Sequence, residues 1–117
     1  MIEITRGTTP IISCIVPEEI PVHEADEIWF TITQNGTMIA DRKLSENNVT
    51  VENNIISIKL SQTESLKLKT YEKAEAGVQL YRSSDDTRWS LNEPEPIFVK
   101  RINKDGEMKV LKEDTNE

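Results

Sequence analysis

EIWFTITQNGTMIA, residues 27–40, alternates apolar and polar side chains and is interrupted once, by Asn35-Gly36. A two-residue type I′ turn needs positive φ at both central positions, which Asn tolerates and Gly adopts freely. An Asn-Gly pair between two alternating runs is the strongest short signal for a β-hairpin. The segment therefore predicts two antiparallel strands, and with them a small domain built from β-sheet.

The position of the turn also predicts which side chains share a face of the sheet. With the turn at residues 35–36, Ile32 lies opposite Ile39 and Thr33 lies opposite Met38, and opposed residues share a face. The more apolar set is assigned to the core: Ile28, Phe30, Ile32 and Ile39. The alternate positions then face outward: Trp29, Thr31 and Thr33.

Similar signals recur along residues 1–102. Asn53-Asn54 predicts a second hairpin, with Val51 beside Ile56 and Val49 beside Ile58. The Ser61–Glu64 spacing is that of a capping box and predicts one short helical turn. Other strands are expected at residues 2–5, 11–16, 74–82, 88–91 and 97–102. Strands spaced about ten residues apart predict an all-β, antiparallel β-sandwich over residues 1–102, with an open barrel as second choice.

The ends of the chain carry weaker signals. Residues 2–5 and the last strand, which follows Pro94 and Pro96, are candidate sheet edges, because proline cannot donate a ladder hydrogen bond. Residues 103–117 are expected to form at most a short terminal hairpin at Asp105-Gly106 and a flexible polar tail.

Composition excludes several classes of partner. The 117 residues include 36% hydrophobic and 5% aromatic residues and carry a net charge of −7. This charge repels phosphate backbones and anionic lipid, so nucleic acid and membrane surfaces are poor partners. A secretion signal and a membrane span are both missing from the pattern, so the protein is expected to work without crossing a membrane by itself.

We find no residues spaced for catalysis, cofactor binding or metal binding, and the chain is expected not to be an enzyme. A zinc site needs three or four ligands, whereas Cys14 and His23 are the only residues of their types. Cys14 lies in an apolar strand and is expected in the core. Carboxylates crowd residues 18–27 without the order of a calcium loop, so a solvated acidic rim is the better interpretation.

Trp29, Tyr81 and Trp89 form the one candidate binding cluster. The expected strand pairing turns Trp29 outward. Leu80 is expected to face inward, so its neighbour Tyr81 is expected on the opposite, outward face. Exposed aromatic side chains on a sandwich anchor protein interfaces or stack on sugar rings. The competing interpretation is that each of them covers a second face or packs beneath a loop.

A resemblance to a known family rests on four short motifs. They are Ile4–Pro10 (ITRGTTP), the Asp-marked entry to the Ile-x-Phe-x-Ile strand, Leu60–Ser65 (LSQTES) and Gly77–Leu80 (GVQL). Together they resemble small proteins of phage and prophage tail modules, and most closely the amino-terminal immunoglobulin-like domain of baseplate upper proteins. The chain differs from that family by stopping after one domain.

The resemblance implies an immunoglobulin-like sandwich with a structural or adaptor role in a virion. With neither a signal peptide nor a transmembrane segment in the pattern, the expected location is the virion or the host cytoplasm. Other virion or tail proteins would be its partners, together with further copies of itself in a homo-oligomer. The resemblance carries over no catalytic residues. The alternatives left open by the sequence are a carbohydrate-binding module that uses the three aromatics and a small inhibitor directed at the host.

Overall fold

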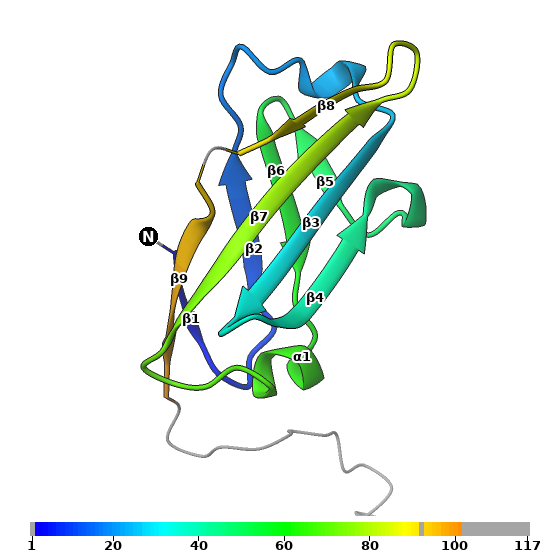
Figure 1. The fold of residues 1–117 in the computed structure, drawn as a ribbon. Helices are drawn as coiled ribbons and strands as arrows, with labels where there is room; N and C mark the ends of the chain where they lie inside the picture. Colours follow the sequence, from blue (N-terminus) through cyan, green and yellow to red (C-terminus); the bar gives the residue numbers. More distant parts are fainter. Residues whose placement is uncertain (1, 92, 102–117) are drawn as a thin grey trace, which may run out of the picture.

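Two β-sheets and one short helix make up the fold of residues 2–91 and 93–101, which the computed structural model describes (Figure 1). The strands are β1 (Ile2–Thr5), β2 (Ile11–Ile15), β3 (Glu27–Gln34), β4 (Thr37–Lys43), β5 (Thr50–Glu52), β6 (Ile55–Lys59), β7 (Lys73–Arg82), β8 (Thr87–Ser90) and β9 (Glu95–Lys100). The helical segments are α1 (Gln62–Leu66) and the 3-10 turns η1 (Val22–Glu24) and η2 (Leu44–Glu46). The hairpin and tail expected at residues 103–117 lie outside the described residues. The all-β prediction is confirmed.

The expectation of a wholly antiparallel architecture is wrong. The larger sheet has the order β1-β9-β7-β3-β4, with β8 paired to β7, and in it β1 runs parallel to β9. The smaller sheet, β2-β6-β5, is antiparallel throughout. Parallel neighbours cannot be joined by a tight turn, and here most of the chain separates them. Their pairing therefore left no local signal in the sequence.

The proline-marked strand β9 is also not an edge strand. It lies between β1 and β7, whereas β1 lies at the edge, as the sequence predicted. Pro96 pairs with Glu75 of β7, and pairing with β1 begins only at Ile97. Within the described residues, Pro96 thus precedes the stretch of β9 that pairs with β1, which fits the missing N–H at this position.

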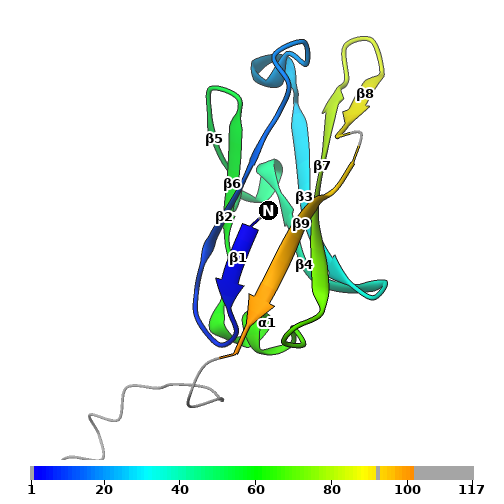
Figure 2. The same ribbon diagram turned by 90° about the vertical axis from the view of Figure 1, so that its left-hand side faces the viewer.

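The core fills the space between the two sheets, which face each other in the side view (Figure 2). Alternation places the side chains there as predicted, because every second residue is buried along β3 and along β7 from Ala74 to Leu80. The largest fully buried side chain is Phe30 of β3. Cys14 lies in the same core, also as predicted.

The first hairpin forms with one irregularity. Asn35 and Gly36 have φ angles of 53° and 79°, as a type I′ turn requires. Thr33 pairs with Met38 as expected, but Ile32 pairs with Ala40 instead of Ile39, because the register shifts between Ile32 and Thr33. A bulge of this kind places two residues against one. Ile39 and Ala40 are consequently both buried.

The helix forms as its signal predicted, and the second hairpin forms in part: the expected pairing of Val51 with Ile56 is present, and that of Val49 with Ile58 is not in the ladder. Val51 pairs with Ile56, while β5 begins at Thr50, so Val49 is buried just outside the ladder. The capping box at α1 forms, with both reciprocal hydrogen bonds between Ser61 and Glu64. No helix in the described residues is long and apolar enough to cross a membrane.

Candidate functional site

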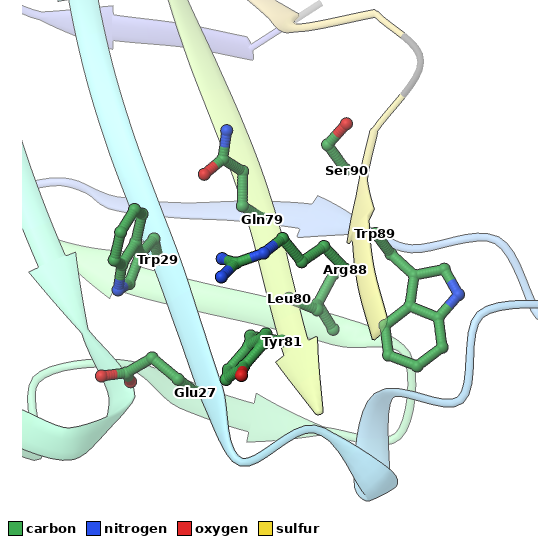
Figure 3. Close-up of a pocket in the computed structure, with 8 residues that line it drawn as sticks. All are labelled: Glu27, Trp29, Gln79, Leu80, Tyr81, Arg88, Trp89 and Ser90. Atoms are coloured by element: carbon green, nitrogen blue, oxygen red, sulfur yellow. The ribbon is translucent and has the colours of Figure 1, made fainter. Parts of the chain in front are cut away.

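The candidate site lies on the outer face of the larger sheet, formed by the side chains of β3, β7 and β8 that point away from the core. A shallow hollow of about 240 Å³ opens there (Figure 3). Its lining residues are Glu27, Trp29, Gln79, Leu80, Tyr81, Arg88, Trp89 and Ser90. Strand pairing brings them together, because Trp29 lies opposite Gln79 and Tyr81 lies opposite Arg88.

A second hollow, of about 190 Å³, continues the first along the sheet and shares Gln79 and Ser90 with it. Gly77 lies in its floor, opposite Thr31 of β3. The missing side chain at Gly77 contributes to this depression. The two hollows together form a concave strip that a side chain or loop of another molecule could enter.

Two contacts hold Tyr81 in place, one on its ring and one at its hydroxyl. The guanidinium of Arg88 lies over its ring, 4.4 Å from the ring centroid, and its hydroxyl donates a 3.0 Å hydrogen bond to Asp86. That hydrogen bond, followed by desolvation, raises the pKa of Tyr81 above its ordinary value of 10. Figure 3 shows the Arg88 side chain reaching from β8 across β7. One face of the Tyr81 ring is therefore already occupied.

Trp29 is the open aromatic side chain of this face. It is 44% exposed, as the sequence predicted, and the ammonium nitrogen of Lys43 lies 6.0 Å from its ring centroid. Trp29 and Tyr81 come from the neighbouring strands β3 and β7 and point to the same side of the sheet. These two members of the predicted cluster are brought together.

Trp89 does not join them. It lies opposite Leu80, whose side chain is buried, so it turns toward the core side of the sheet and is only half-exposed. The guanidinium of Arg82 covers its ring at 5.1 Å, and Arg82 is itself paired with Asp85 and Glu24. Trp89 thus packs against the core, whereas the competing interpretation had expected it to cover a second face or to pack beneath a loop.

The sequence contained a signal for this difference. A turn at Ser83–Asp86 pairs Arg82 with Thr87 and hence Leu80 with Trp89. Paired residues share a face of the sheet, so Trp89 faces inward like Leu80. The same strand pairing places Arg88 opposite Tyr81. Sequence reasoning did not assign the other lining residues to the site: Glu27, Gln79, Leu80, Arg88 and Ser90.

The carboxylates of Glu27 and Asp26, near the site, are hydrogen-bonded to neighbouring segments of the chain. Glu27 accepts hydrogen bonds from the backbone nitrogen and hydroxyl of Ser45, at 3.0 and 2.6 Å. Desolvation would raise the pKa of Glu27, but these hydrogen bonds outweigh it and lower the pKa. Asp26 likewise accepts two hydrogen bonds from Ser83. The acidic rim expected at residues 18–27 is therefore partly tied to neighbouring turns.

The other candidate residues lie apart. Cys14 is buried, which raises the pKa of its thiol to about 11, and His23 is exposed in η1. Among the described residues, no three His, Cys, Asp or Glu side chains are grouped so that they could hold a metal ion. No family model matches the chain, and no curated protein matches it.

Proposed function

We propose that this chain is a non-enzymatic binding domain of a phage or prophage particle, a structural or adaptor protein that acts through protein–protein contacts. The observation that carries the proposal is the composition of the outer face. Trp29, Tyr81 and Arg88 stand together there around a hollow. Tryptophan, tyrosine and arginine are the residue types that dominate the binding energy of protein interfaces.

We also propose that the sandwich is immunoglobulin-like, and the strand order supports this. The smaller sheet, β2-β6-β5, corresponds to the B-E-D strands of such a domain, and β9-β7-β3-β4 corresponds to G-F-C-C′. The strand β8 is an addition between F and G. The phage assignment is supported by the sequence motifs that resemble baseplate proteins.

The site geometry favours a protein partner over a glycan. Stacking on a sugar needs an open aromatic face. Arg88 covers one face of Tyr81, and Trp89 faces the other way, so Trp29 alone remains as a platform. The guanidinium of Arg88 and the amide of Gln79 beside it are well placed for hydrogen bonds to a protein backbone.

The test measures incorporation of the chain into particles. In a host whose prophage encodes it, Trp29→Ala and Arg88→Ala should each lower the copies per purified particle at least about tenfold, as loss of an interface anchor does. Glu52→Ala, an exposed change on β5 of the other sheet, is the matched control and should leave the copy number unchanged.

Two outcomes would overturn the proposal. One is absence of the wild-type chain from purified particles. The other is glycan binding in solution that Trp29→Ala abolishes, which would assign the site to carbohydrate.

A further inference from the structure

Strand β2 lies at one edge of the smaller sheet in the described part of the chain. Among the described strands it pairs only with β6, and residues 10–17 (PIISCIVP) contain no charged side chain in a chain that is 30% charged. Proteins usually shield sheet edges with charges, bulges or a covering segment, because an open edge recruits other strands. Ile11 and Ile15 point outward from β2 and are 69% and 75% exposed.

The hydrogen-bond phase of β2 shows which peptide groups face the open edge. The carbonyl of Pro10 accepts from the Leu60 nitrogen at 2.9 Å, and the Val16 nitrogen donates to Asn54 at 2.8 Å. In an antiparallel ladder every second residue makes such bonds. The even-numbered residues of β2 therefore face β6, and the backbone groups of Ile11, Ser13 and Ile15 face outward from the sheet edge.

We propose that β2 pairs antiparallel with β2 of a second copy of this chain, about a two-fold axis through Ser13. The outward backbone groups are self-complementary about this axis. Ser13 meets Ser13 of the second copy, and Ile11 meets Ile15 of the second copy, each pair exchanging two backbone hydrogen bonds. Pro17 is the next residue whose backbone groups would face the open edge. Because proline has no N–H, the ladder between the two copies ends there.

The side chains support the same arrangement. Ile55 already lies opposite Ile15 within one copy, and pairing of the edges would add Ile11 of the second copy to this apolar row. The hydroxyls of Ser13 and Ser57, 2.7 Å apart, lie beside the axis. A self-complementary patch is what a two-fold homodimer requires.

Charge also favours this strand as the contact between copies. Each copy carries a net charge of −7, so approach through most faces is repulsive. Strand β2 has no charged side chain of its own, and the charges nearest to it are Lys59, opposite Ile11, and Glu95, which contributes to the raised pKa of Cys14. This strand therefore reduces the cost of approach. A ladder of five residues buries less surface than a standard protein interface, which buries about 1,200–2,000 Å². We therefore expect a concentration-dependent dimer, with a Kd on the order of 10–100 µM.

This dimer is independent of the proposed function. The smaller sheet carries the new contact, and the outer face of the larger sheet lies on the opposite side of the sandwich, so a dimer would present two binding faces. Two linked sites raise the apparent affinity for a repetitive assembly.

The test is sedimentation velocity of the full chain between about 1 µM and 1 mM, with two matched double variants. In Ile11→Lys/Ile15→Lys, like charges meet across the two-fold, so dimerisation should weaken at least tenfold. In Ile11→Lys/Ile15→Glu, opposite charges meet, so the dimer should persist and weaken in high salt. The first variant lowers the magnitude of the net charge, from −7 to −7 + 2 = −5, so overall repulsion cannot explain its loss.

Both substituted side chains, Ile11 and Ile15, are exposed, so far-ultraviolet circular dichroism should show folded protein for both variants. Two results would overturn the proposal. The wild-type chain could remain monomeric at every concentration, or the two double variants could dimerise equally.

Discussion

The guanidinium of Arg88 lies over the ring of Tyr81, 4.4 Å from its centroid, because β7 and β8 pair these residues directly. Asp86, in the turn between the two strands, accepts the hydrogen bond of the Tyr81 hydroxyl. The hairpin segment 81–88 thus fixes an aromatic and a cationic side chain before any partner arrives. Rigid anchors of this kind lower the entropic cost of binding.

The Tyr81–Asp86 hydrogen bond has a spectroscopic consequence. Ionisation of Tyr81 loses that bond, so its pKa lies above 10. In a Tyr71→Phe background, the tyrosinate absorbance of Tyr81 should rise at a higher pH than in free tyrosine. Asp86→Asn should move the midpoint down, and asparagine suits the φ of 56° at this position. An unchanged midpoint would contradict the geometry.

Glu64 links stability to pH. The guanidinium of Arg42 donates two hydrogen bonds to its carboxylate, joining β4 to α1, and this chiefly holds the pKa of Glu64 below 4.5. The folded state therefore favours the ionised form, and the stabilisation is present above pH 4.5 and lost as the pH falls through the lowered pKa.

Glu64→Gln isolates this effect, because glutamine also serves at the third position of a capping box. We expect the variant to be less stable at pH 7 by about 1–2 kcal/mol, and the difference to shrink at pH 3. Urea unfolding at both pH values measures it. An equal difference at both values would show that Glu64 acts by packing alone.

Gln34 is a buried polar residue of β3 with every group used. Its amide nitrogen donates to the carbonyls of Lys69 and Glu72, and its amide oxygen accepts from the Lys69 nitrogen. Gln34→Leu keeps the side-chain size but leaves these backbone groups without partners, which should cost about 2–4 kcal/mol of unfolding free energy.

Hydrogen exchange should at the same time speed up in residues 67–72. The exposed Gln79 of the same sheet is the matched control, and Gln79→Leu should change stability by no more than about 0.5 kcal/mol. Equal effects of the two substitutions would mean that the buried hydrogen bonds contribute little.

Cys14 should be chemically protected by the fold. Its pKa of about 11, against 9.0 for an unperturbed thiol, lowers the thiolate fraction at pH 8 about 100-fold, and burial blocks access as well. Alkylation by iodoacetamide should therefore be slow in native protein and complete in denaturant. Fast labelling without denaturant would indicate that β2 opens readily.

Local chemistry predicted most of the fold. The turn at Asn35-Gly36, the capping box at Ser61 and the alternation of β7 each depend on neighbouring residues, and each formed as expected. The parallel pairing of β1 with β9 depends on two segments at opposite ends of the chain, and the bulge between Ile32 and Thr33 depends on tertiary packing. Neither leaves a local trace.

The site was predictable in part for the same reason. The alternation of side chains along a single strand was enough to predict that Trp29 and Tyr81 face outward. The position of Trp89 required pairing across the turn at Ser83–Asp86, and Gln34 is buried because its partners lie in a loop more than thirty residues away. Polar residues that satisfy distant backbone groups do not stand out in an alternating strand.

Photo-crosslinking inside the particle tests the proposed role most directly. A photoreactive phenylalanine analogue would replace Trp29 in one sample and Glu52 in the other, in particles purified after prophage induction. We expect the chain in the particles, crosslinked to another structural protein from position 29 and not from position 52. A chain absent from the particles, or equal crosslinking from both positions, would contradict binding through the outer face.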